Sequence, residues 1–188
     1  ELEVENYVEH TIKYVTTTAE YGDLSDEATT MAKKPLTGLK IGNPDGWTKK
    51  GDISYYVTSE KAHSGNMALR VTYGANAEQY LWHDVPKEAG KYRVTMYVTD
   101  LIGAWFQLQA RFDTNSTQPG HLNDYRDGVT LTREEQSDGW TKVSYIVTNP
   151  TGAFRIATSS PQMQFTIDDI SVVKIDDNGN ALTGNLMT

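Results

Sequence analysis

The chain has 188 residues, a formal net charge of −8 at pH 7 and no cysteine. This length suits a single domain with a substantial core, the acidic balance argues against a nucleic-acid partner, and the lack of cysteine excludes disulfides and thiolate metal sites. No apolar run reaches the roughly 18 residues of a membrane-spanning helix, and the 11 Tyr and 4 Trp predict a fold rich in β-strands.

The N-terminal part of the chain has the weakest pattern. Glu1–Glu9 alternates apolar and acidic residues and predicts an edge strand guarded by charge. A second strand is expected at 11–18, and the polar stretch 20–38 is either a loop or a short helix that ends before Pro35. The chain starts at Glu1 without Met or an apolar leader, so a signal peptide, if one existed, has been removed. The absence of cysteine fits an exported bacterial protein, and we expect a secreted or cell-surface location.

Beyond Trp47 the pattern becomes regular, with short alternating segments separated by Gly, Pro, Asn and Asp. Strands are predicted at 53–58, 67–73, 78–85, 92–99, 104–113, 143–147, 154–158 and 164–174. Many short strands without a long helix predict an all-β fold, a β-sandwich jelly roll of two antiparallel sheets that spans residues 1–175. Residues 176–188 are predicted to be a turn and a linker towards a further module.

The stretch Leu101–Asp113 carries the clearest functional signal. It is predicted to be a strand that alternates from Ala104 onward, with Phe106 and other apolar residues on the core face. The opposite face then carries Trp105, Gln107, Gln109 and Arg111. An aromatic plate beside amides and a guanidinium suits a ligand that is hydroxyl-rich on its edges and C–H-rich on its faces, as a sugar ring is. A solvated outer face that happens to hold a Trp is the plain alternative.

Further aromatic residues are predicted on faces opposite the core. Tyr80 and Trp82 share one such face, although the reverse assignment, with Trp82 in the core, fits the mixed pattern of that strand equally well. Tyr97 is predicted on the non-core face of the next strand. If these strands share the concave sheet, their outward side chains form a binding groove, to which Tyr125 in the long 114–139 connection is added.

Several phrases of the sequence resemble one family. Glu60–Val71, EKAHSGNMALRV, is similar to the hSGnyaLrv phrase of the jelly-roll carbohydrate-binding modules of families four, nine and twenty-two. Val85–Val98, VPKEAGKYRVTMYV, resembles their v.l..GkYrvs.wv strand pair. Gly139–Val143 and Phe165–Val172 resemble the two parts of their W..v and f.iDDvsv ending. The resemblance runs from about Trp47 to Lys174 and does not include the N-terminal third.

The resemblance implies a non-catalytic module that binds a polysaccharide, a plant or microbial β-glycan, in a groove on the concave sheet. It implies a monomeric module within a larger chain, where it holds an attached enzyme on its substrate. Two other classes stay open: a jelly-roll polysaccharide lyase or glycoside hydrolase, and a structural or adhesive surface module. A hydrolase requires paired carboxylates, and no central pair is obvious. For a lyase, His121 and Tyr125 in the long connection are the candidate residues, and Arg111 is a further option.

The resemblance also implies a structural calcium ion that ties the first strand to the last. The residues mapped onto this site are Glu60, the backbone carbonyl of His63, one of Asp168 and Asp169, and Glu5 or Glu9. Carboxylates and carbonyls are the oxygen ligands that calcium takes. Neighbouring strand residues point to opposite faces, so only one of the two adjacent aspartates is expected to bind the metal. A solvated acidic turn is the alternative.

Overall fold

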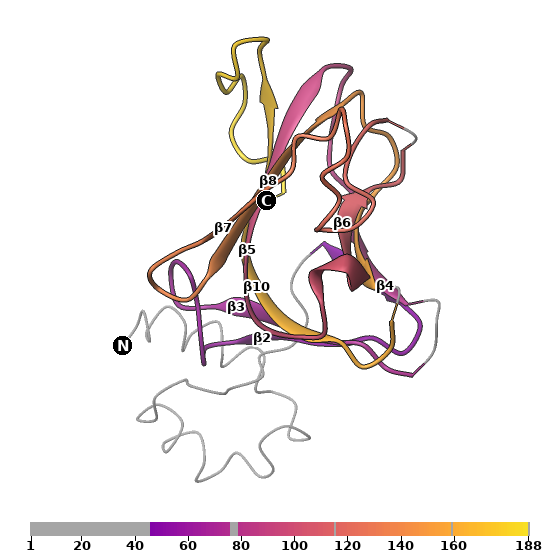
Figure 1. Ribbon diagram of the computed structural model, residues 1–188, viewed down its shortest axis with the longest axis vertical. Helices are drawn as coiled ribbons and strands as arrows, with labels where there is room; N and C mark the ends of the chain where they lie inside the picture. The colour runs from indigo at the N-terminus through magenta and orange to yellow at the C-terminus, as the bar shows by residue number, and fades with distance from the viewer. Residues whose placement is uncertain (1–45, 76–78, 115, 159, 188) are drawn as a thin grey trace, which may run out of the picture.

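The computed structural model describes residues 46–75, 79–114, 116–158 and 160–187. In this part of the chain, regular structure consists of ten strands and one short 3₁₀ helix (Figure 1). The strands are β1 (Trp47–Lys50), β2 (Ser54–Thr58), β3 (Ala68–Thr72), β4 (Tyr80–His83), β5 (Lys91–Ile102), β6 (Leu108–Phe112), β7 (Thr132–Glu135), β8 (Thr141–Thr148), β9 (Phe154–Thr158) and β10 (Gln164–Ile175). The helix is η1 (Trp105–Gln107). No helix in these ranges is long and apolar enough to cross a membrane.

The strands form two antiparallel sheets that pack face to face (Figure 1). β1, β4, β9 and β6 make up a four-stranded sheet in that order, and β2, β3, β10, β5, β8 and β7 make up a six-stranded sheet. From β3 onward the chain changes sheet at every strand except in the β7–β8 pair. This repeated crossing between antiparallel sheets is typical of a jelly-roll sandwich. The predicted fold class is therefore confirmed.

The core fills the space between the two sheets. The inward side chains of β5, each no more than 1% exposed, are Tyr92, Val94, Met96 and Val98. On the opposite sheet, Phe112 of β6 packs edge to face on Phe154 of β9, with ring centroids 5.4 Å apart. Full burial of an apolar side chain of this size contributes about 1.5–3 kcal/mol. The alternation predicted for β5 is confirmed, and this burial fixes which face of each strand remains outside.

The outer edge of β6 is covered by the connection that follows it. The buried side-chain amide of Gln118 donates to the Phe112 carbonyl at 2.9 Å and accepts a hydrogen bond from the Phe112 amide at 3.1 Å. Farther along, the Leu122 amide donates to the Leu108 carbonyl at 2.9 Å. These contacts satisfy backbone groups at both ends of the strand, which would otherwise lack partners. The connection is thereby held along β6.

The C-terminal residues fold back along β10. β3 pairs only with the first part of β10, at Gln164–Ile167. Beside the second part, the Leu186 amide donates to the Val172 carbonyl at 2.9 Å, and Leu186 and Met187 pack against the core. The sequence predicts a turn and a linker here, and the structure shows a segment packed on the domain. A further module after it stays a prediction.

A turn of helix interrupts the strand that the sequence predicts over 104–113. The Gln107 amide donates to the Ala104 carbonyl, and the Ala104 amide donates to Gln107 Oε1, both at 2.9 Å. These local hydrogen bonds close η1 in place of a strand ladder, and β6 begins only at Leu108. Gln107 is predicted to line the groove, but its side-chain oxygen accepts a hydrogen bond from the backbone of this turn. An alternating pattern does not reveal such a turn, because the residues around it still alternate in polarity.

The exposure of the two aromatic side chains before Leu108 consequently differs from the prediction. Phe106, predicted in the core, is 59% exposed. Trp105, predicted as an exposed plate, is partly buried and packs against the core. Both assignments are wrong, because the turn of η1 replaces the predicted strand at these residues, and the two-face alternation of a strand does not apply to it. From Leu108 onward the predicted alternation is confirmed, with Gln109 and Arg111 on the outer face.

The reversed pair of aromatic residues can be tested by its effect on stability. Phe106→Ala is expected to change the free energy of unfolding by less than about 0.5 kcal/mol, because the ring is exposed. Trp105→Ala removes a ring that contacts the core and is expected to cost roughly 1–3 kcal/mol, below the about 3–5 kcal/mol of a fully buried aromatic. Urea denaturation of both variants measures the difference. A larger loss for Phe106→Ala would contradict the η1 turn.

Candidate functional site: the outer face of the four-stranded sheet

The outer face of the four-stranded sheet carries most of the strand residues predicted to bind a ligand. On β4, Leu81 and His83 point into the core with exposures of 0% and 8%, whereas Tyr80 and Trp82 face outward. This alternation decides between the two assignments that the sequence left open for Trp82. The ring is not a core residue, and it is available on the same face as Tyr80.

β9 brings residues of β4 and β6 together in two rows. Trp82 pairs with Arg155, and Arg155 pairs with Arg111 on its other side. The next row holds Tyr80, Ala157 and Gln109. Directly paired side chains on one face of an antiparallel sheet have Cβ atoms about 4.5–5.5 Å apart. An indole ring, two guanidinium groups and an amide therefore lie on one continuous surface.

Arg155 is held in place by an aromatic ring and a carboxylate. Its guanidinium carbon lies 4.1 Å from the centroid of the Tyr80 ring, and its Nε lies 2.7 Å from Asp113 Oδ1. Lys50 of β1 approaches the same ring, with Nζ 5.7 Å from the centroid. Such cation–ring contacts contribute about 0.5–1 kcal/mol at exposed sites. Tyr80 is thus engaged within the protein, whereas Trp82 makes no ring or cation contact with the residues that the structure describes.

Gln109 and Arg111 border a hollow beside β6. Arg111 Nη2 donates to the Thr114 carbonyl at 3.3 Å, and Gln109 Nε2 lies 3.1 Å from His121 Nε2. Burial, and after it the positive charge of Arg111, lower the pKa of His121 from its usual value. A neutral ring can accept the hydrogen bond from the Gln109 amide. The hollow has a volume of about 390 Å³, and its polar lining consists of Gln109, Arg111, Asp113, Thr114, Thr151 and Arg155.

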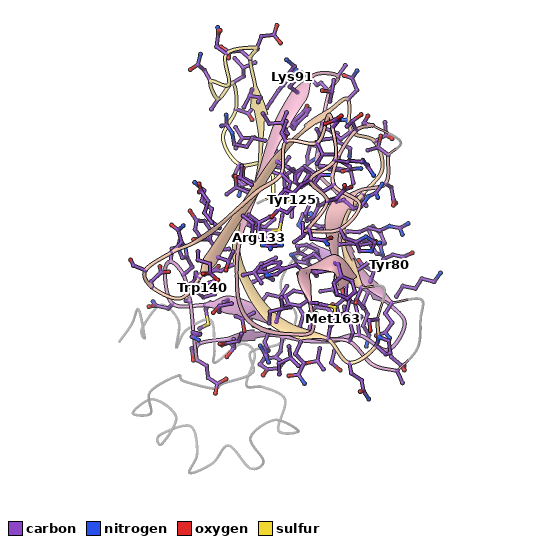
Figure 2. The ribbon with its side chains drawn as sticks, viewed as in Figure 1. Tyr80, Lys91, Tyr125, Arg133, Trp140 and Met163 are labelled. Atoms are coloured by element: carbon purple, nitrogen blue, oxygen red, sulfur yellow. The ribbon has the colours of Figure 1, made fainter. Side chains whose placement is uncertain are left out.

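Three predicted binding residues lie elsewhere. Tyr97 belongs to β5 of the six-stranded sheet, where its ring stacks on His63 with 3.6 Å between centroids. Trp105 and Tyr125 both contact Arg133 of β7, whose guanidinium carbon lies 4.7 and 5.9 Å from their ring centroids. Figure 2 shows Tyr125 and Arg133 together in the middle of the view, with Tyr80 beside β4 at its edge. The expectation that all these residues share one groove is therefore wrong.

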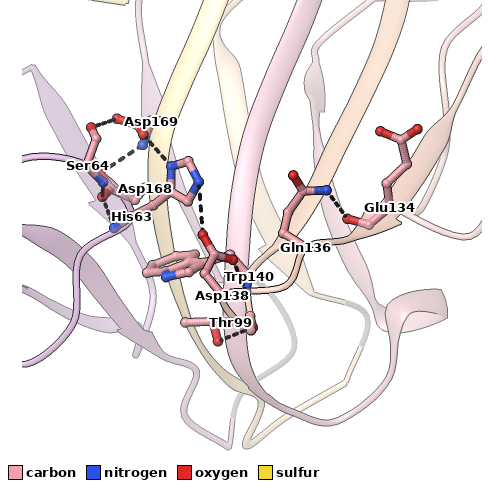
Figure 3. A network of polar contacts seen from close by, with 10 residues as sticks. His63, Ser64, Thr99, Glu134, Gln136, Asp138, Trp140, Asp168 and Asp169 are labelled. Atoms are coloured by element: carbon pink, nitrogen blue, oxygen red, sulfur yellow. Dashed lines mark hydrogen bonds and ion pairs between the residues drawn. The ribbon is translucent and has the colours of Figure 1, made fainter.

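Three of the predicted metal-binding residues, His63, Asp168 and Asp169, meet where the turn between β2 and β3 contacts β10 (Figure 3). The His63 amide donates to Asp168 Oδ2 at 2.8 Å, and His63 Nδ1 lies 2.7 Å from Asp169 Oδ2. The Ser64 hydroxyl donates to Asp169 Oδ1 at 2.6 Å. On its other side, His63 Nε2 lies 3.7 Å from Asp138 Oδ2. Both adjacent aspartates thus contact the same turn. We call the cluster of His63, Ser64, Asp168 and Asp169 the His63 junction.

Both aspartates reach this turn because β10 is irregular here. The register between β10 and β5 shifts between Asp168 and Ser171, and Asp169 has a φ of 48°. A β-bulge of this kind redirects side chains that would otherwise alternate. The prediction that the two aspartates point to opposite faces is therefore wrong. Burial raises the pKa of Asp168, and the hydrogen bonds from the backbone amides of His63, Asp169 and Ser64 act in the opposite direction.

The described residues do not complete a calcium site at the His63 junction. The oxygens of Asp168 and Asp169 accept hydrogen bonds from N–H and O–H groups, which a metal ion would have to replace. Within the described ranges, no group of three or more His, Asp or Glu side chains is placed to hold a metal. Glu60 is exposed, and its amide donates to Thr58 Oγ1. Glu5 and Glu9 lie outside the described residues, and calcium stays a prediction.

Sequence reasoning did not identify Arg155 and Lys50 as members of the outer face. The alternation of Phe154–Thr158 does indicate that Arg155 faces away from the core, because its neighbours on both sides are apolar. Its position between Trp82 and Arg111 depends on the pairing of β9 with two strands that are distant in sequence. No local pattern carries that information.

Comparison with known proteins gives similar folds at low identity. No protein-family model and no curated protein matches the chain. Two CBM22 xylan-binding domains of Xyn10C from Paenibacillus barcinonensis are similar to this chain. The first is 16% identical, and the match covers 71% of this chain and 88% of that domain, with a TM-score of 0.45. The second is 15% identical, and the match covers 72% of this chain and 96% of that domain, with a TM-score of 0.44. The C-terminal family 22 carbohydrate-binding module of Clostridium thermocellum Xyn10B is 11% identical over 75% and 90%, with a TM-score of 0.40. At these values, the role of the outer face has to be argued from its own residues.

Proposed function

We propose that this chain is a non-catalytic carbohydrate-binding module whose ligand lies on the outer face of the four-stranded sheet. The observation that carries the proposal is the row Trp82, Arg155 and Arg111, with Gln109 in the next row. An outward indole ring offers a flat apolar surface to the C–H face of a sugar. The amide and guanidinium groups beside it offer fixed hydrogen bonds to the hydroxyl groups at the edges of the sugar.

The extent of this face favours a chain of sugars over a single sugar. Neighbouring strands lie about 4.7–4.9 Å apart, so the outward side chains from β4 across β9 to β6 cover roughly 10 Å. The hollow of about 390 Å³ continues this surface beside β6. We therefore propose a plant or microbial β-glycan as the ligand, bound along the surface by stacking on Trp82 and by hydrogen bonds to Gln109 and the arginines.

The residues of this face argue for binding over hydrolysis. β1, β4, β6 and β9 contain no Asp or Glu. Asp113, directly after β6, is ion-paired with Arg155. A glycoside hydrolase usually needs two carboxyl groups on either side of the scissile bond. For the lyase alternative, His121 contacts Gln109 of β6, whereas the contact given for Tyr125 is with Arg133 of β7.

We propose that the module is secreted or displayed on the cell surface and that it holds an attached enzyme on its polysaccharide. In this role it would act as a monomer joined to the enzyme by the chain. The solved structures named above are described as xylan-binding domains or as a carbohydrate-binding module. A glycan array identifies the glycan that this chain prefers.

Trp82→Ala tests the proposed site. The substitution is expected to weaken binding to the best glycan of the array by at least about tenfold, as truncation of a central aromatic in an interface does. The melting temperature should hardly change, because Trp82 is outside the core. Isothermal titration calorimetry measures the affinity, and thermal melting measures the stability. Phe106→Ala is the control, since it removes another exposed aromatic that lies outside these four strands.

Three results would contradict the proposal in different ways. Unchanged affinity of Trp82→Ala would mean that the ligand binds elsewhere. Release of reducing sugars, or of unsaturated products, from the bound polysaccharide would favour the enzyme alternative. No binding to any glycan of the array would favour a structural or adhesive module.

Calcium at the His63 junction is a second proposal, and its support is the meeting of Asp168, Asp169 and the His63–Ser64 turn. An ion that binds only the folded chain stabilises it by mass action. EDTA is expected to lower the melting temperature, and Asp169→Ala should abolish this effect. Glycan affinity should not change, because the junction belongs to the six-stranded sheet. Identical melting curves with and without EDTA would show that hydrogen bonds alone hold the junction.

A further inference from the structure

The strands beneath the proposed site are positively charged within an acidic protein. The chain has a formal net charge of −8. In contrast, β1, β4, β6 and β9 contain no Asp or Glu. Their lysines and arginines are Lys49, Lys50, Arg111 and Arg155. Arg111 and Arg155 are direct partners on the outer face. Like charges directly opposite each other destabilise a sheet, and a carboxylate beside either guanidinium offsets part of this cost.

Arg155 has such a contact and Arg111 does not. Arg155 is ion-paired with Asp113 at 2.7 Å and covered by the Tyr80 ring. Arg111 donates only to backbone carbonyls, those of Phe112 at 3.4 Å and Thr114 at 3.3 Å. These are long hydrogen bonds to neutral groups. Among the residues that the structure describes, no carboxylate forms an ion pair with Arg111.

The carboxylate of Asp124, which lies near Arg111, already contacts other groups. Asp124 Oδ2 accepts hydrogen bonds from the Gly120 amide at 2.9 Å and lies 3.1 Å from Arg126 Nη1. Arg111 is close enough to His121 to lower its pKa further, beyond the effect of burial. The guanidinium of Arg111 therefore borders the hollow without an ion pair to a described carboxylate, and the one carboxylate in the lining, that of Asp113, is paired with Arg155.

We propose that Arg111 binds a carboxylate of the ligand, so that the glycan recognised by this face carries uronate groups. This inference rests on the proposed function and names the ligand class for the same surface. A guanidinium offers parallel N–H donors that match the two oxygens of a carboxylate, and it stays charged at every physiological pH. The hollow beside Arg111, with Gln109 and Thr151 in its lining, provides space for such a group. Trp82 would hold the neighbouring sugar ring.

Matched acidic and neutral glycans test this inference. Glucuronoxylan, polygalacturonate and alginate are each compared by calorimetry with the same polysaccharide after reduction of its carboxyl groups to alcohols. The wild-type chain is expected to bind at least one acidic form roughly 10- to 100-fold more tightly than its reduced form. Arg111→Gln is expected to remove this preference, and Arg111→Lys, which keeps the charge but not the fork, to retain part of it.

Lys91→Gln is the matched control for charge. It removes one positive charge from β5, on the other sheet, and is expected to keep the preference for the acidic form. Equal losses in Arg111→Gln and Lys91→Gln, or comparable binding of polyglutamate, would overturn the inference in favour of a general attraction to polyanions. If Arg111→Gln melts at the wild-type temperature, its loss of preference is not caused by unfolding. If Arg111→Gln does unfold, the affinity of Arg111→Lys for the acidic and reduced glycans tests the inference instead.

The remaining outcomes separate the inference from the proposed function. Equal affinity of the wild-type chain for acidic and reduced glycans would overturn the role of Arg111 and leave the carbohydrate-binding module in place. Binding to none of the glycans, acidic or neutral, would overturn both.

Discussion

The register of β9 between β4 and β6 is the constraint on which the proposed site depends. Phe154 and Ile156 are fully buried, and they force Arg155 and Ala157 to the outer face. Antiparallel pairing on both sides then fixes which residues of β4 and β6 become their neighbours. A slip of one residue would bury a guanidinium and divide the surface, which is why core packing also determines the arrangement of the outer face.

Among the described residues, aromatic rings contact arginine guanidinium groups in two places, with different consequences. On the outer face, Arg155 lies over Tyr80 and is also paired with a carboxylate, so the contact orders a surface that is open to a ligand. In the other place, Arg133 of β7 contacts both Trp105 and Tyr125, and Trp105 packs against the core. The same pair of side-chain types thus supports a candidate site in one place and helps to cover the core in the other.

The fold follows from the sequence more directly than the site does. The alternation of β5 and of β6 after Leu108 reports burial, which is a local property of each strand, and the sandwich follows from many such strands. The turn at Trp105–Gln107 was not predictable in this way, because its hydrogen bonds involve Ala104 and not a partner strand. The sheet to which a strand belongs depends on contacts between distant segments, so the pattern around Tyr97 does not show that β5 is in the six-stranded sheet.

The bulge in β10 shows a further limit of pattern reasoning. Asp168 and Asp169 read as ordinary alternating strand residues, yet the positive φ of Asp169 turns both towards His63 and Ser64. Asp is one of the residues that tolerate this backbone region. The sequence therefore permits the bulge, and the structure places it where the turn between β2 and β3 contacts β10.

The two hydrogen bonds between the Gln118 side chain and the backbone of Phe112 determine how the edge of β6 can interact with other molecules. An amide side chain here takes the place that a neighbouring strand would occupy. Extended peptides often bind by adding a strand to an exposed sheet edge, and exposed edges also promote self-association. At the Phe112 end of β6, Gln118 prevents a peptide from pairing with the strand edge in this way. Recognition beside Gln109 and Arg111 is therefore left to side chains that project from the face of the sheet, and these suit a ligand without a peptide backbone.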